Sequence, residues 1–169
     1  MPGRVIGTEL PLGYPGTIAR TPDAIIMNRM VKDDSANIGY GKPVILNGDN
    51  TYSAFGADNT ADQFGGVAIR EVKMATNYYD QNDVEYLPGQ QCDVLERGSI
   101  IVKCPKGIPT AGGKVYIRIA ANNTYPGSKV GDFEAEADGS NTVELTGVVW
   151  ATGRMDADKC CELLIKERV

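Results

Sequence analysis

The 169-residue sequence contains no histidine. Histidine is the side chain that most often acts as a general base near neutral pH and as a metal ligand, so its absence argues against an enzyme. The sequence shows no serine or cysteine nucleophile with a partner base and no catalytic pair of carboxylates, since every candidate nucleophile lacks a histidine partner. We therefore predict a protein that is not an enzyme and that carries no cofactor.

Long apolar runs and clusters of positive charge are also missing. No segment approaches the roughly 20 apolar residues of a membrane helix, and the N-terminus lacks the basic start and apolar run of a signal peptide. The net charge is −5 with a pI near 4.8, and Lys and Arg nowhere cluster into a stripe that would follow a phosphate backbone. We expect no membrane and no nucleic acid among the partners, and synthesis in the cytosol.

Candidate metal and phosphate sites are weak. Asp33-Asp34 and the pair Asp156 and Asp158 lack the spacing of a calcium loop, so we interpret them as solvated turn carboxylates and predict no metal site. Residues 107–115 resemble a phosphate loop only loosely, because the lysine comes one residue late and a strand follows, and we predict a hairpin loop. The four cysteines have no C-x-x-C spacing, which favours reduced, mostly buried thiols.

Glycine and proline are abundant, with 20 and 9 residues, and they separate short apolar runs typical of strands. Residues 114–119 alternate apolar and polar side chains without a break, which predicts a half-buried strand. Residues 92–95 and 99–104 flank a predicted tight turn at 96–98, and residues 67–72 predict a strand with one solvated face. About eight strands at intervals of about ten residues predict a mainly β fold, a small antiparallel β-barrel or sandwich.

The segment from Tyr14 to Gly41 is too apolar for a free tail and too interrupted for a helix. Prolines at 11, 15 and 22 push the preceding residues toward extended geometry, which predicts an extended N-terminal arm. We divide the chain into this arm, residues 1–37, and a β domain, residues 38–169. The arm needs a surface to lie on, and that surface belongs either to its own domain or to a neighbouring chain.

Aromatic side chains raise the alternative of a carbohydrate-binding module. Trp150, Tyr116 and a group of Tyr78, Tyr79 and Tyr86 could stack on sugar rings. Trp150 lies in the most apolar predicted strand, however, and we interpret it as a core residue.

Two stretches of the arm segment carry a resemblance to a known family. Residues 13–26 read Gly-Tyr-Pro-Gly-Thr-Ile-Ala-Arg-Thr-Pro-Asp-Ala-Ile-Ile, and the pair Asn28-Arg29 follows them. Residues 38–44 then read Ile-Gly-Tyr-Gly-Lys-Pro-Val. Together they resemble the N-terminal segment of the structural cement (decoration) proteins of tailed bacteriophage capsids. Residues 97–102, 113–116 and 142–150 look like the β domain of that family.

The resemblance implies a structural virion protein, made in the host cytoplasm, that sits on the outer surface of the capsid. Its expected partners are the major capsid protein, whose capsomers it would bridge, and further copies of itself in a homotrimer. The alternatives are another β-rich virion component, from the tail or baseplate, and the carbohydrate-binding module.

We expect the arm to supply the contacts with the capsid or a sister subunit. Arginines could form paired hydrogen bonds with capsid carboxylates, and apolar side chains could fill grooves or pack on their own domain instead. Deletion of residues 1–30 is expected to leave a folded β domain that no longer decorates capsids. The predicted contact residues are Arg4, Val5, Ile6, Leu10, Leu12, Tyr14, Arg20, Ile25, Ile26 and Arg29.

Overall fold

The computed structural model describes residues 11–71 and 84–167, and its regular structure is almost entirely β, as predicted. The strands are β1 (Ile18–Met30), β2 (Ile38–Gly39), β3 (Pro43–Leu46), β4 (Tyr52–Ala54), β5 (Phe64–Ala68), β6 (Glu85–Tyr86), β7 (Gln91–Lys103), β8 (Lys114–Arg118), β9 (Phe133–Glu134), β10 (Thr142–Met155) and β11 (Cys160–Ile165). Two single-turn 3-10 helices, Ala61–Gln63 and Gly139–Asn141, complete the described elements. No helix in these two ranges is long and apolar enough to cross a membrane.

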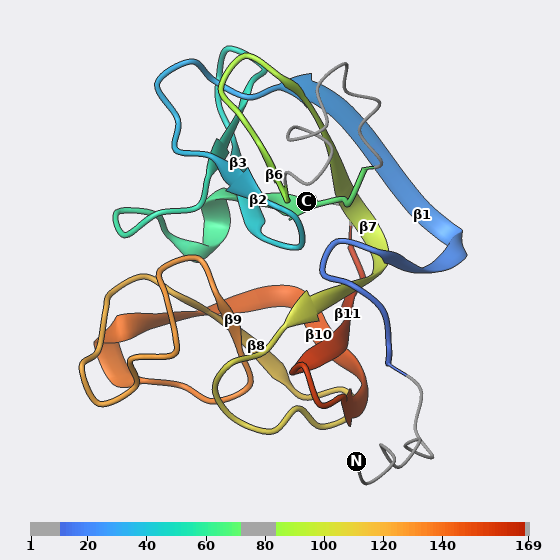
Figure 1. Ribbon diagram of the computed structural model, residues 1–169, viewed down its shortest axis with the longest axis vertical. Helices are drawn as coiled ribbons and strands as arrows, with labels where there is room; N and C mark the ends of the chain where they lie inside the picture. The colour runs from blue at the N-terminus through green and yellow to red at the C-terminus, as the bar shows by residue number, and fades with distance from the viewer. Residues whose placement is uncertain (1–10, 72–83, 168–169) are drawn as a thin grey trace, which may run out of the picture.

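Nine of the strands form one curled antiparallel sheet in the order β4-β3-β5-β7-β11-β10-β8-β9, with β1 added alongside β7. Strands β2 and β6 form a separate two-stranded sheet. Figure 1 shows an upper lobe built from β2 to β6 and a lower lobe built from β8 to β11, with β7 running through both. The predicted mainly β fold is confirmed, and the curled antiparallel sheet has the form of a half-barrel.

Strand β7 is continuous where we predicted a tight turn at residues 96–98, and that prediction is wrong. Gly98 has a φ of 120°, so the strand bends there without leaving the sheet. Its first half pairs with β1 and β5, and its second half with β1 and β11, so both halves keep their hydrogen-bonding neighbours. Glu96, which suggested a solvated turn, is buried beside Arg29.

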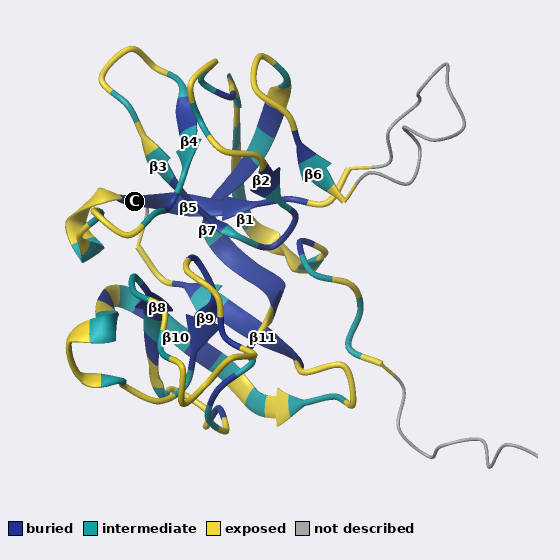
Figure 2. Ribbon diagram, turned by 60° about the vertical axis from the view of Figure 1, so that its left-hand side comes forward, coloured by how far each residue is buried: buried dark blue, intermediate teal, exposed yellow. Residues whose placement is uncertain are grey.

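Two hydrophobic clusters fill the lobes, and β5 separates them. Phe64 and Val67 belong to the larger cluster, which also contains Trp150, whereas Ala68 belongs to the smaller one. The strand predicted at residues 67–72 shares only residues 67 and 68 with β5, and the exposed Arg70 and Glu71 follow the strand. All five residues of β5 are buried, as Figure 2 shows, so the predicted solvated face is wrong for this strand, because each face meets a different core. Trp150 is fully buried, as predicted, and so are the four cysteines, whose thiols are free.

Two further sequence interpretations can be compared with the sheet. Gly147 has a φ of 77° at a register shift in β10, so the bulge expected from this glycine is present. The loop after β7 leads to β8, as expected, but β11 and β10 lie between these two strands. Residues 107–113 are thus a crossover between distant strands and not a hairpin loop.

Strand β1 carries residues 18–30 of the predicted arm alongside β7. Between Arg20 and Ile25 the register jumps, because four residues of β1 stand opposite the single residue Gly98 of β7. Pro22 lies in this unpaired stretch, where its missing N–H removes no hydrogen bond from the ladder. From residue 18 to residue 30, the surface that the segment lies on is therefore its own sheet.

Candidate functional site

The two turns that bracket the arm segment touch each other in the fold. The Gly16 backbone N–H donates to Ile101 O at 2.8 Å, and the Arg70 N–H donates to Gly16 O at 2.8 Å. Gly16 has a φ of 85°, and a Cβ atom there would come within 2.7 Å of Arg70 N and 3.0 Å of Gly41 N. Glycine at position 16 therefore allows the approach to β1 to dock against the turn at Gly41.

Replacing Gly16 with alanine should lower the free energy of unfolding by about 1–3 kcal/mol, because the side chain meets backbone atoms and disfavours the positive φ. Gly48→Ala is the matched control, since a Cβ there meets nothing within 4 Å and its φ is not positive. Urea unfolding measures both variants. Equal stability of the two would show that the docking of this turn is not tight.

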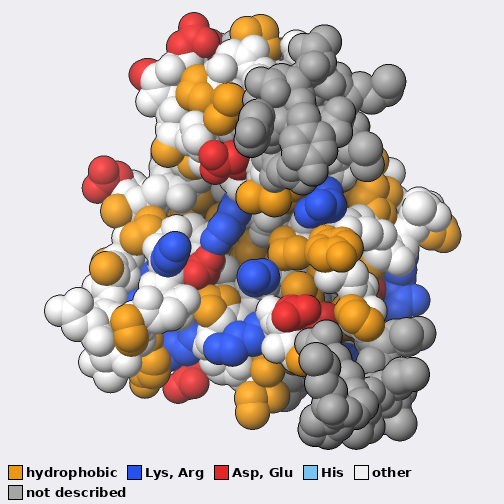
Figure 3. Space-filling view, viewed as in Figure 1, with side chains coloured by type: hydrophobic (Ala, Val, Ile, Leu, Met, Phe, Trp, Pro, Cys, Tyr) orange, Lys and Arg blue, Asp and Glu red, His pale blue; other side chains and the backbone are white. Residues whose placement is uncertain are grey.

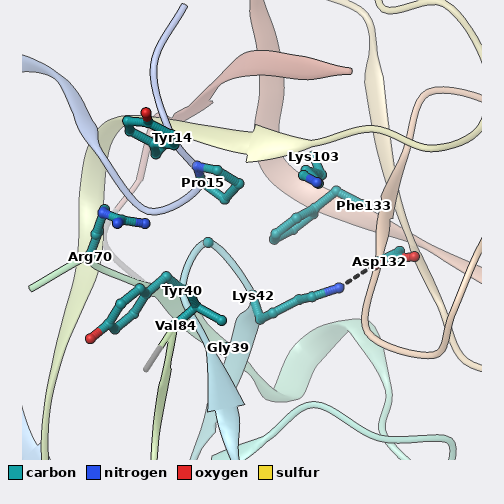
Figure 4. A pocket seen from close by; sticks show the side chains of 11 residues that line it. Tyr14, Pro15, Gly39, Tyr40, Lys42, Arg70, Val84, Lys103, Asp132 and Phe133 are labelled. Atoms are coloured by element: carbon teal, nitrogen blue, oxygen red, sulfur yellow. Dashed lines mark hydrogen bonds and ion pairs between the residues drawn. The ribbon is translucent and has the colours of Figure 1, made fainter. Parts of the chain in front are cut away.

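A cavity of about 330 Å³ opens beside this docked turn, between the two lobes. Its walls are Tyr14, Pro15, Gly39, Tyr40, Gly41, Lys42, Arg70, Val84, Lys103, Asp132 and Phe133. Figure 4 shows Tyr14 and Pro15 above the space, Tyr40 and Lys42 below it and Phe133 at its side. The Arg70 guanidinium lies 4.9 Å from the centre of the Tyr14 ring and 5.7 Å from that of Tyr40. These cation–π contacts hold the arginine at the mouth of a mostly apolar space, whose other charged side chains are Lys42, Lys103 and Asp132.

A second cavity, of about 350 Å³, continues the first and is much more charged. It is lined by Lys42, Lys103, Pro105, Gly127, Lys129, Asp132, Asp158 and Lys159. The two spaces share Lys42, Lys103 and Asp132, and we call their combined lining the interlobe groove. Figure 3 shows Lys and Arg side chains gathered across the middle of this face.

A buried ion network supports the lower wall of the interlobe groove. The Arg118 guanidinium donates to Glu134 Oε2 at 3.0 Å and lies 2.9 Å from Asp138 Oδ2, and both Arg118 and Glu134 are 0% exposed. The Asn122 amide donates to Asp138 at 2.9 Å, and this bond, together with Arg118, lowers the pKa of Asp138 to about 2. Arg118 belongs to the polar set of the half-buried strand predicted at residues 114–119, the set expected to face the solvent. It is buried because β9 brings Glu134 alongside.

Six of the ten predicted contact residues lie in the described part of the chain; Arg4, Val5, Ile6 and Leu10 lie outside it. The Leu12 N–H donates to Asp156 Oδ2 at 3.0 Å, and Tyr14 is 69% exposed at the interlobe groove. Ile25 is half-buried and Ile26 exposed on β1. These residues are spread along the arm and are not gathered in one cluster.

The two described arginines of this set pair within their own domain. Arg20 Nε donates to Glu162 Oε1 at 2.6 Å, although Arg20 itself is exposed. Arg29 Nη1 donates to Glu96 Oε1 at 2.9 Å, its Nε donates to Asn50, and its guanidinium lies 5.0 Å from the centre of the Tyr52 ring. Both bonds to the carboxylates raise the pKa of the arginine that donates them.

The acidic pairs considered for metal binding have local partners. Asp156 accepts hydrogen bonds from the backbone N–H groups of Leu12, Asp158 and Cys160, and thus orders its turn. The Asp34 carboxylate lies 3.5 Å from Lys32 Nζ. Within residues 11–71 and 84–167, no group of three or more His, Cys, Asp or Glu side chains could hold a metal ion.

The aromatic residues considered for sugar stacking do not form one exposed platform among the described residues. Trp150 and Tyr86 are fully buried, and Tyr116 is half-buried. Tyr78 and Tyr79 lie outside the described residues.

Comparisons with known proteins agree with this architecture. The family described as "Structural cement protein (E217 gp24/Pam3 gp6)" matches residues 2–166. A solved structure described as "The capsid of Myoviridae Phage XM1" contains a chain with the same fold, at a TM-score of 0.73 and 14% sequence identity, with 100% of each chain covered. No curated protein matches the sequence.

Proposed function

The chain belongs to the structural cement protein family of phages, and on that basis we propose that it decorates the outer surface of the capsid by bridging capsomers of the major capsid protein. As a member of this family it is a structural component of the virion. The match of the family over residues 2–166 carries the proposal. We further propose that it works as a homotrimer and without enzymatic activity.

The physical task of such a protein is to resist the separation of neighbouring capsomers when packaged DNA raises the internal pressure. Contact area spread over several partners serves this purpose, and an extended segment reaches about 3.3 Å per residue. In the described residues, β1 pairs with β7 on one side only, and residues 19–23 are exposed. The free edge of β1 can therefore accept a strand or an extended segment from a neighbour.

We assign capsid or subunit contacts to Arg4, Val5, Ile6, Leu10 and Leu12, and to the exposed side chains of Tyr14, Arg20 and Ile26. Arg29 and Ile25 face their own domain more than the solvent. This division changes the deletion experiment. Removing residues 1–30 would remove the β1 ladder with β7 as well as the contacts, so the test must end before the docked turn at Gly16.

Deletion of residues 2–11 should leave the sheet folded and should lower the affinity for expanded heads by about tenfold or more. The sheet survives because the β1 ladder, the Gly16 turn and both cores begin after residue 11. Co-sedimentation with expanded heads measures binding, and thermal unfolding checks the fold. A truncated protein that is folded and binds fully would remove the arm from the contact.

Electron microscopy of virions carrying a labelled copy tests the location independently. Label on the outer surface of the head supports the proposal. Label on the tail or baseplate would favour the other virion role that the sequence left open.

A further inference from the structure

The interlobe groove combines an apolar end with a strongly cationic end, although the chain as a whole has a net charge of −5. We propose that this groove receives an extended acidic segment of the major capsid protein. The proposal rests on the cement role proposed above and names the partner segment that one surface recognises.

The charges of the groove are unbalanced. Five cationic side chains line it, from Lys42, Arg70, Lys103, Lys129 and Lys159, against two carboxylates, from Asp132 and Asp158. Such an excess, enclosed between walls of low dielectric, concentrates positive potential and attracts an acidic ligand.

Three of these cations have no carboxylate partner among the residues that the structure describes. Lys42 pairs with Asp132, and Lys159 Nζ donates to Pro105 O at 3.0 Å. For Arg70, Lys103 and Lys129, no carboxylate lies within ion-pair distance in residues 11–71 and 84–167. These three side chains can therefore pair with a ligand without first breaking an ion pair described here.

The apolar end gives the segment a second feature to match. Tyr14 and Val84 expose most of their side chains at the mouth, and Phe133 and Pro15 form walls further in. The close contact of the docked turn at Gly16 with Gly41 fixes the wall that carries Tyr14 and Pro15. This wall therefore loses little conformational entropy when a ligand binds. A segment with one aromatic or aliphatic side chain followed by Asp or Glu residues fits both ends.

A protein segment fits this lining better than a nucleic acid does. Asp132 and Asp158 stand among the lysines, and they would repel a phosphate backbone laid along the groove. A peptide carries separate charges that can meet the lysines and avoid these two carboxylates. The apolar end also offers Pro15 and Phe133 as walls against which an inserted side chain can pack.

The double variant Lys103→Glu/Lys129→Glu tests the proposal on expanded heads assembled from the phage's own major capsid protein. We expect its affinity to fall by about tenfold or more, with a weaker dependence of binding on salt, because two attractions become repulsions. Arg154→Glu/Lys166→Glu is the matched control, since both side chains are exposed, lie outside the groove lining and change the net charge equally. The control should stay within about threefold of the wild type.

The outcomes separate this proposal from the cement role. If the wild type does not bind heads, the proposed function itself fails. If the wild type binds and the groove variant binds equally well, or if both double variants lose affinity to the same extent, the groove proposal is overturned and the cement role stands. Thermal unfolding of both variants checks that the substitutions leave the fold intact.

Photo-cross-linking identifies the occupant directly. A benzoylphenylalanine at position 127, a groove-lining glycine where an added Cβ meets nothing within 4 Å, keeps all five cations in place. Bound to heads, it should cross-link to a segment of the major capsid protein that is rich in Asp and Glu. Mass spectrometry of the cross-linked peptides identifies the segment. Replacing the acidic residues of that segment with lysine should restore binding of the Lys103→Glu/Lys129→Glu variant. Cross-links only to another copy of this chain, or to a single-stranded oligonucleotide offered in competition, would overturn the proposal.

Discussion

Replacing Arg118 with methionine should lower the free energy of unfolding by about 3–5 kcal/mol, the range for removing one partner of a buried ion pair. Arg118 and Glu134 are both 0% exposed, so the substitution leaves the Glu134 carboxylate buried without its counter-charge. It also removes the contact of Arg118 with Asp138 at 2.9 Å. Urea unfolding followed by tryptophan fluorescence measures the loss, because Trp150 is the single tryptophan and lies in the same lobe.

The same strand offers a control for this experiment. Lys114 on β8 pairs with Glu144 at 2.8 Å, but its side chain is 67% exposed, and Lys114→Met should leave the free energy of unfolding almost unchanged. The double variant Arg118→Met/Glu134→Leu should recover much of the stability, because an apolar pair replaces a charge left alone. If Arg118→Met is no more damaging than Lys114→Met, the buried network does not stabilise the lobe.

The network also connects stability with the interlobe groove. Arg118 and Lys106 contact Asp138, which also accepts a hydrogen bond from Asn122 in the loop that follows β8. The same loop carries Lys129 and Asp132. Lys129 N–H donates to Asp132 Oδ2 at 2.7 Å, which fixes the two groove residues relative to one another. Buried charge in the lower lobe therefore holds part of the groove lining in place.

Local pattern was enough to predict the strands whose two faces meet different surroundings. Residues 114–119 alternate strictly, and β8 occupies Lys114–Arg118. The pattern failed for β5 and β7, because these strands lie between two cores and are buried on both faces. Glu96 and Gly98 in the middle of β7 resembled a turn, because a charged residue and a glycine are typical of one. Only the fold shows that Glu96 is buried in an ion pair with Arg29.

The interlobe groove could not be predicted in the same way. Its cations stand at positions 42, 70, 103, 129 and 159, so no window of the sequence contains a basic cluster. Strand order brings them together, and strand order depends on long-range pairing that periodicity does not encode. The arm segment was easier to recognise, because residues 13–26 and 38–44, which carry the family resemblance, are each continuous in the sequence. The close backbone contact between Gly16 and Gly41 in these two runs is visible only in the fold.

Arg29→Met tests whether this arm residue serves the domain or the capsid, and it should lower the free energy of unfolding by about 3 kcal/mol, the low end for a buried pair. The Arg29 side chain is 12% exposed and donates to Glu96 at 2.9 Å. Its guanidinium also contacts Tyr52, whose pKa burial raises to about 12. We expect head binding by the folded fraction to be unchanged, because the side chain has little surface left to offer a partner.

Arg20→Met is the matched control on the same strand, since Arg20 is 64% exposed and its pair with Glu162 lies at the surface. Loss of the Arg20 side chain should leave the free energy of unfolding almost unchanged, while head binding should weaken if the exposed guanidinium contacts the capsid. Urea unfolding and co-sedimentation with expanded heads, carried out on both variants, separate the two roles. A stable Arg29→Met protein with impaired head binding would reverse the assignment and return Arg29 to the capsid contact.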